Sequence, residues 1–165
     1  MNRERIYSLG MEIVAAEYDA EAFDIEGYPG TYISIRDREV CIRIIYIVDG
    51  HEKSAYALFA YHDFYVRDNK DALEEVNKLN LEIRNGDKRY ALSRYGIQMI
   101  VPIKISGDST IEQINSVFCL LRDSLEDFRN VIYSIEEIYG LAETSSAEIS
   151  DGEASLGLSA LFKDC

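Results

Sequence analysis

The stretch DALEEVNKLNLEI at residues 71–83, followed by KRYALSRYGIQMIVPIKI at 88–105 and STIEQINSVFCLLRDSLEDF at 109–128, decides the fold. The first segment has apolar residues at helical spacing, and the last begins with a capping box formed by Ser109 and Glu112. The middle segment is rich in β-branched and aromatic residues around a glycine-containing turn, which predicts a hairpin. We therefore predict a helix, a two-strand hairpin and a second helix, joined by short connections.

Upstream of this block, the sequence predicts a helix and a three-strand meander. Apolar residues recur every three or four positions from residue 3 to 17, as in an amphipathic helix. After a break at Tyr28-Pro29-Gly30, residues 31–48 predict two strands, and only Arg43 interrupts the apolar run of the second. A third strand is expected over residues 54–66. The fold class is therefore α+β: helix, three-strand antiparallel meander, helix, two-strand hairpin and long C-terminal helix.

The last predicted helix is longer than a compact domain needs. Its apolar stripe continues to residue 139, and about 30 helical residues span roughly 45 Å, against roughly 37 Å across a domain of this size. Either part of the helix overhangs, bends or meets a second chain, or the helix breaks near Phe128 or Asn130; both alternatives stay open. Pro102 in the preceding strand cannot donate to a sheet ladder, so we expect that strand at an edge or with a bulge.

Composition divides the chain into one domain over residues 1–140 and an acidic tail over 141–165, rich in Ser, Ala and Gly and expected to be flexible. The net charge of −13 disfavours nucleic-acid phosphates and anionic lipids as partners, although it also simply maintains solubility. No apolar run approaches the roughly 20 residues of a membrane span, and acids between residues 12 and 21 interrupt any signal-peptide core. We expect a cytoplasmic protein with no nucleic-acid or membrane partner, and a basic protein partner stays open.

Two asparagines near the end of the middle helix have a structural interpretation. Asn77 and Asn80 lie three residues apart and hence on one face of the helix. An amide supplies both a donor and an acceptor, so we expect these side chains to satisfy backbone groups of the following hairpin. The alternative is that both are exposed polar residues near a helix end.

With this Asn-x-x-Asn pair, the segment ALEEVNKLN, the hairpin RYALSRYGIQMIVPIKI and the helix after it resemble the YbjN family of bacterial sensory transduction regulators. Members of that family are similar in fold to type III secretion chaperones. The resemblance covers about residues 3–128 and implies a non-enzymatic protein linked to sensory or stress regulation that dimerises frequently. The long final helix and the acidic tail depart from the family's usual short ending.

Residues with catalytic or metal-binding chemistry are few. His51 and His62 are the histidines of this chain; we expect His51 in a solvated turn and His62 in the core or half-buried in the third strand. The cysteines lack the spacing of a disulfide framework or a zinc site: Cys41, Cys119 and Cys165. We therefore predict no enzyme activity, no cofactor and no metal site.

Aromatic and apolar side chains supply the candidate protein-binding residues. The chain has 12 tyrosines and no tryptophan. Phe59, Tyr61 and Tyr65 share one face of the third predicted strand, and they would face solvent if helices cover only the other side of the sheet. The alternative is that both faces are covered. The last helix supplies the remaining candidates: Phe128, Ile132, Ile135 and Tyr139.

These patterns favour a non-catalytic protein-binding module, chaperone-like or regulatory, that acts as a homodimer. A second hypothesis is an acidic immunity or antitoxin-like protein that neutralises a basic partner. A third is an enzyme that uses His62 with neighbouring carboxylates, and it rests on the fewest residues.

Overall fold

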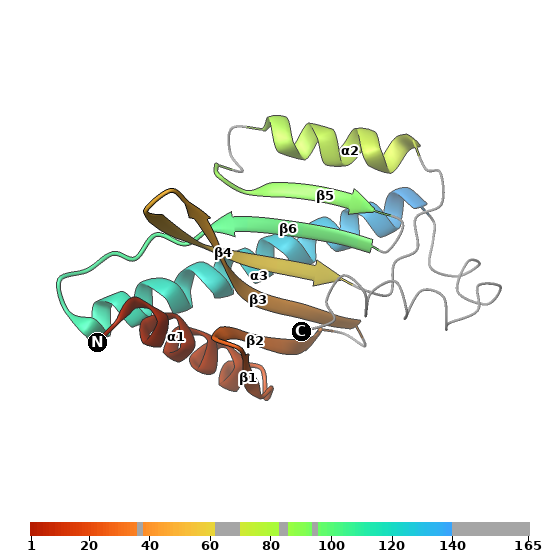
Figure 1. Ribbon diagram of the computed structural model, residues 1–165. Helices are drawn as coiled ribbons and strands as arrows, with labels where there is room; N and C mark the ends of the chain where they lie inside the picture. The colour runs from red at the N-terminus through yellow and green to blue at the C-terminus, as the bar shows by residue number, and fades with distance from the viewer. Residues whose placement is uncertain (36–37, 62–69, 83–85, 94–95, 140–165) are drawn as a thin grey trace.

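The computed structural model describes residues 1–35, 38–61, 70–82, 86–93 and 96–139. These residues form one six-stranded sheet in the order β1-β2-β3-β4-β6-β5, in which neighbouring strands run antiparallel (Figure 1). The helices are α1 (Arg3–Glu17), α2 (Lys70–Leu81) and α3 (Thr110–Tyr139). The strands are β1 (Ala22–Ile25), β2 (Tyr28–Ile35), β3 (Arg38–Asp49), β4 (Glu52–Tyr61), β5 (Arg89–Ser93) and β6 (Gly96–Pro102).

The α+β class and the order of the predicted elements are confirmed, but the meander contains one strand more than expected. β1 pairs with β2 through a tight turn at Glu26 and Gly27, whose φ angles are 55° and 84°. The Asp24 carboxylate supports the turn by accepting a hydrogen bond of 2.8 Å from the Gly27 backbone N–H. Tyr28, expected to lie in a break, is instead the first residue of β2.

The hairpin of β5 and β6 extends the same sheet, because β6 pairs with β4. β6 is therefore an interior strand, and the expectation that Pro102 marks an edge strand is wrong. Pro102 is tolerated because it is the last residue of β6, where its missing N–H interrupts the ladder least. The next residue, Ile103, again donates from its backbone N–H to the Ala55 carbonyl oxygen at 2.8 Å.

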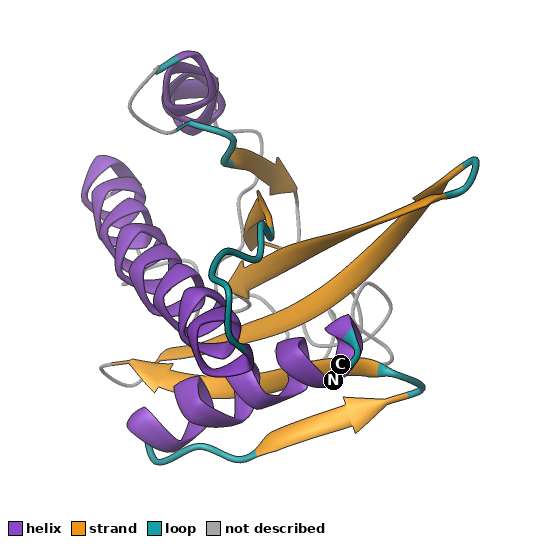
Figure 2. Cartoon of the chain, turned by 90° about the vertical axis from the view of Figure 1, so that its left-hand side faces the viewer, coloured by secondary structure: helices purple, strands orange, loops and turns teal. Residues whose placement is uncertain are grey.

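The β3–β4 hairpin projects beyond the rest of the sheet (Figure 2). Its register continues to Asp49 opposite Glu52, so only Gly50 and His51 form the loop, and Gly50 has a φ of 62° that favours glycine. Near the tip, Ile47 and Val48 are 47% and 67% exposed. The predicted continuation of the third strand to residue 66, including His62, lies outside the described residues.

α1 and α3 lie side by side on one face of the sheet, while α2 packs against β5 and α3 (Figure 2). The crossing of α1 and α3 is close at Gly10, where a Cβ atom would lie only 2.5 Å from Val117 Cγ1. The core between these helices and the sheet is formed by large apolar side chains, among them Met11, Ile33, Ile42, Phe59, Leu121 and Phe128. The sheet face opposite α1 and α3 carries no helix of the described chain.

α3 is one continuous helix of 30 residues, so the predicted break near Phe128 or Asn130 is absent. The capping box is confirmed: the Glu112 N–H donates to Ser109 Oγ at 3.2 Å, and the Ser109 N–H donates to Glu112 Oε2 at 3.1 Å. At the other end of the helix, Ile132 and Ile135 are buried in the core of this chain. The part of the apolar stripe from Leu121 to Ile135 is therefore buried within one chain.

Candidate protein-binding surface

Two of the aromatic residues expected on an exposed surface belong to the core. Phe59 is fully buried and Tyr61 is 3% exposed, because α3 covers their face of the sheet. The ring centroid of Phe59 lies 6.0 Å from that of Phe128. The prediction that these two side chains face solvent is therefore wrong, and Tyr65 lies outside the described residues.

The candidates on α3 are also used by the fold. Phe128, Ile132 and Ile135 are between 0% and 4% exposed, so none presents a binding surface in this chain. Tyr139 is the last residue of α3, and its side chain lies outside the described part of the structure. Phe128, Ile132 and Ile135 therefore offer no free apolar surface to a homodimer interface.

Polar contacts hold the end of α3 to the sheet. Arg38 at the start of β3 donates to the Tyr61 hydroxyl at 3.0 Å, and that hydroxyl donates to Glu136 Oε1 at 3.2 Å. Arg38 also forms an ion pair with Glu136. Because these side chains are partly or fully buried, their bonds fix the long helix in one position over β3 and β4.

Asn80 has the structural role expected of it, whereas Asn77 is exposed. The Asn80 side chain donates to the Tyr90 carbonyl oxygen at 2.8 Å and accepts from the Tyr90 N–H at 2.7 Å. Tyr90 lies on β5, which is an edge strand, so these backbone groups have no neighbouring strand to pair with. The amide thus occupies a position at which another chain could add a strand.

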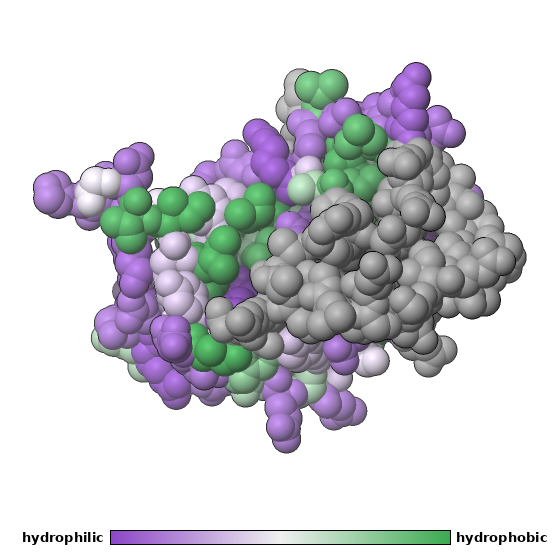
Figure 3. Space-filling model, turned by 45° about the vertical axis from the view of Figure 1, so that its right-hand side comes forward, coloured by the Kyte–Doolittle hydropathy of each residue, from purple (hydrophilic) through white to green (hydrophobic). Residues whose placement is uncertain are grey.

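The surface that the sequence did not single out is the sheet face opposite α1 and α3, which we name the second face. Side chains alternate along each strand, so the neighbours of the core residues Ile42 and Phe59 point to this side. By the strand register its residues include Phe23, Tyr32, Cys41, Arg43, Leu58, Ala60 and Ile100, with the polar Gln98 on β6 and Arg89 on β5. In Figure 3, which views the molecule obliquely from this side, hydrophobic side chains are visible beside the residues drawn in grey.

The apolar part of the second face forms a small cluster of its own. Cys41 and Ala60 are each 1% exposed, and the half-buried Tyr32 and Leu58 pack against them. The ring of Phe23 lies directly over Gly30, where a Cβ atom would be 2.6 Å from the ring carbons. Glycine at this position therefore lets the ring contact the strand, and the Phe23 and Tyr32 centroids are 5.5 Å apart.

Arg43 is a cation on β3, near the middle of this surface. It is 9% exposed, and its Nε atom is shielded from solvent without a hydrogen-bond partner. The guanidinium carbon lies 5.4 Å from the ring centroid of Tyr28, an attractive cation–π distance. The sequence pattern had shown Arg43 as the interruption of an apolar strand, but periodicity does not reveal whether such a residue has a partner.

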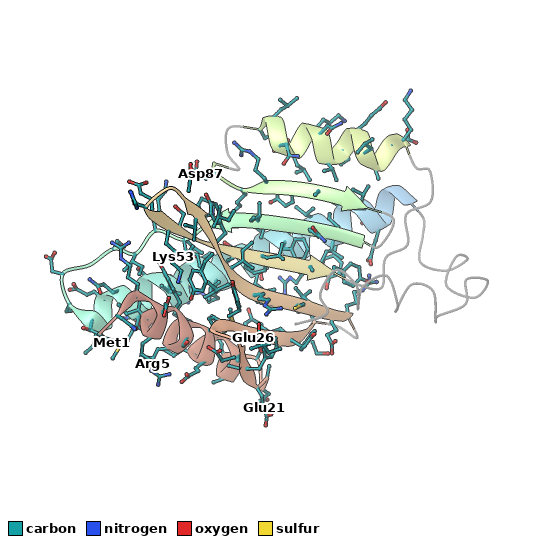
Figure 4. The ribbon with its side chains drawn as sticks, in the orientation of Figure 1. Met1, Arg5, Glu21, Glu26, Lys53 and Asp87 are labelled. Atoms are coloured by element: carbon teal, nitrogen blue, oxygen red, sulfur yellow. The ribbon has the colours of Figure 1, made fainter. Side chains whose placement is uncertain are left out.

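A cleft of about 570 Å³ lies between the start of α1 and the β3–β4 hairpin. Its lining includes Tyr7, Tyr46, His51 and Lys53, and Figure 4 labels Lys53 on the hairpin. Lys53 Nζ lies 4.2 Å from the Tyr46 ring centroid and forms an ion pair with Glu4. Burial raises the pKa of Tyr46 well above its ordinary value. The Lys53 ammonium group thus contacts both a carboxylate and an aromatic ring at the wall of this cleft.

Other classes of site find no support in the described part of the chain. No three His, Cys, Asp or Glu side chains there gather to hold a metal ion. None of the described helices combines the length and apolarity needed to cross a membrane. No family model, no curated protein and no solved structure matches this chain.

Proposed function

We propose that this protein is a non-catalytic protein-binding module, chaperone-like or regulatory, that holds a partner on the second face of its sheet. An antiparallel sheet covered by helices on one side ordinarily alternates apolar residues inside with polar residues outside. Here the outward positions of β3 and β4 include Cys41, Leu58 and Ala60, and the edge of the surface carries Phe23 and Tyr32. Cys41 and Ala60 are themselves buried, and the half-buried Tyr32 and Leu58 supply the accessible apolar area on a side of the sheet that no described helix covers. Apolar area of this kind is typical of protein interfaces.

Two further observations agree with this proposal. The resemblance of about residues 3–128 to the YbjN family implies the same class of function. Cys41 is buried and Cys119 is half-buried, as is usual for reduced thiols that pack as small apolar side chains, and we place the protein in a reducing cytoplasm. The partner is a protein, and a second copy of this chain is included among the candidates because the resemblance implies dimerisation.

Photo-crosslinking tests where the partner binds. A photoreactive phenylalanine analogue replaces Tyr32 on the second face or, as the control, Ile111, which is 73% exposed at the start of α3. In cells of the source organism, we expect a discrete covalent adduct from position 32 and none of the same mass from position 111. An adduct with the mass of two chains would identify a homodimer. Adducts from position 111 alone would contradict the proposal.

A further inference from the structure

Arg43 is a buried cation without a counter-charge among the described residues. With 9% of its surface accessible, it has lost most of its hydration, yet its shielded Nε has no hydrogen-bond partner. The ion pairs between described residues do not include it. Removing a charge from water without pairing it costs free energy. An apolar side chain of similar size at this position would make the folded sheet more stable. The fold therefore does not explain why a positively charged residue stands at position 43.

The surroundings of Arg43 define what can pair with it. Gly30 lies opposite it on β2 and Leu58 opposite it on β4. On the same side of β3, Glu39 and Asp49 are four and six residues away, roughly 13 Å and roughly 20 Å along the strand, and so cannot reach the guanidinium. Arg43 is thus bordered by apolar groups on both neighbouring strands.

We infer that Arg43 pairs with a carboxylate that a partner protein presents between apolar residues. This inference rests on the proposed function, because it names the chemistry that the second face recognises. A planar guanidinium binds a carboxylate through paired, charge-assisted hydrogen bonds, which become stronger where water is excluded. The apolar side chains around Arg43, such as Leu58 and Tyr32, contact the partner's residues on either side of the acid.

A carboxylate fits this site better than a phosphate does. A phosphate group requires several donors, usually more than one cation or a set of free backbone N–H groups. In the middle of a sheet the backbone N–H groups of β3 are engaged in the ladders with β2 and β4. The net charge of −13 further opposes a dianion or a nucleic acid.

Matched peptide pools test this inference on the full chain. One pool contains acetylated, amidated nonapeptides with a central Asp flanked by Leu, Phe, Tyr and Ser, and the other has Asn in place of the Asp. We expect the wild-type protein to bind Asp peptides at least about tenfold more tightly than their Asn counterparts. Arg43→Met should abolish that preference, whereas Arg122→Met, which removes a charge from the exposed side of α3, should retain it.

The outcomes separate this inference from the proposed function. If the wild-type protein binds both pools equally, the role of Arg43 is overturned and the protein-binding surface stands. If neither the wild type nor the variant described next, in which amides replace the acids of residues 141–165, binds either pool, both are overturned. The comparison of Asp with Asn peptides needs no protein variant, so a misfolded Arg43→Met protein would not decide the result. Arg43→Lys provides a second variant, which retains the positive charge.

The chain itself is the other possible source of the carboxylate. Residues 141–165 contain five acids, which a full-length variant replaces with their amides: Glu143, Glu148, Asp151, Glu153 and Asp164. We expect this variant to bind the Asp peptides as the wild type does. If Asp peptides bind only to the variant, the carboxylate comes from this chain, and the assignment to a partner protein is overturned.

Discussion

Some single side chains have roles in this fold that the periodic pattern of apolar residues does not reveal. Asn80 provides a donor and an acceptor to the backbone of Tyr90, and so completes the hydrogen bonding of an edge strand. Gly10 lets two helices approach each other, because it has no Cβ atom to meet Val117. In each case the residue type is set by the group it faces in the folded chain.

Replacing Asn80 by Ala should destabilise the protein by about 1–3 kcal/mol, because the Tyr90 backbone groups lose both partners in a partly buried position. Asn77→Ala, on the same helix but exposed, should change the free energy of unfolding by less than about 0.5 kcal/mol. Urea denaturation monitored by circular dichroism measures both values. Equal effects from the two substitutions would show that the Asn80 bonds do not support the edge strand.

Gly10→Ala tests the close crossing of α1 and α3. Alanine favours a helix over glycine by about 1 kcal/mol, but here its Cβ would overlap Val117, so we expect a net loss of about 1–3 kcal/mol. Combining it with Val117→Ala should cost at least about 0.5 kcal/mol less than the sum of the single changes. A stabilised Gly10→Ala protein would contradict the described contact.

At the scale of elements, the helices were predicted more accurately than the strands. The period of apolar residues indicated a helix over residues 3–17, and α1 is Arg3–Glu17. β1 was missed because its turn uses Glu26 before Gly27, and glutamate is a much weaker turn signal than asparagine or aspartate in that position. The position of β6 inside the sheet depends on its pairing with β4, which no local pattern reveals.

The candidate site shows the same limit. Alternation along a strand tells which residues share a face, and it correctly separated Phe59 and Tyr61 from Leu58 and Ala60. It does not tell which of the two faces the helices cover. The prediction therefore placed the binding surface on the wrong face of the sheet, because α3 packs on Phe59 and covers that face. Long-range packing, rather than local propensity, determines which side of the sheet is available to a partner.

The start of α3 should show a pH-dependent contribution to stability. Hydrogen bonds from the backbone N–H groups of Ser109 and Asp108 lower the pKa of the Glu112 carboxyl. A carboxyl whose pKa is lowered by folding stabilises the folded state above its unfolded pKa, and that contribution is lost as the pH falls through the folded pKa. We expect wild type to be more stable than Glu112→Gln at neutral pH, with a smaller difference in acid. Urea denaturation measures this, and a constant difference would contradict it.

At the scale of the whole molecule, several tyrosines resist ionisation because the fold buries them. Burial, with smaller effects from the charges of Asp127 and Glu82, raises the pKa of Tyr90 to about 12. Burial likewise raises the pKa of Tyr7 and Tyr46. The unfolded chain ionises its tyrosines first, so the folded state should lose stability as the pH rises above about 10.

Tyr90→Phe isolates one part of this alkaline transition. Between about pH 10 and about pH 12, the wild-type free energy of unfolding should fall more steeply than that of the variant, which has no phenol to ionise at this position. Urea denaturation at a series of pH values provides both curves, and absorbance at alkaline pH counts the tyrosinates. Parallel curves would contradict a raised pKa at Tyr90.

The account as a whole depends on the second face being the surface that holds the partner. The most direct test uses the partner that crosslinking identifies, purified without the crosslink. Calorimetry measures its affinity for wild type, for Leu58→Gln and for the matched control Ile111→Gln. Leu58→Gln should weaken binding at least about tenfold while the circular dichroism spectrum stays unchanged, and Ile111→Gln should leave the affinity within about twofold. Unchanged affinity in Leu58→Gln, with a loss in Ile111→Gln, would contradict the account.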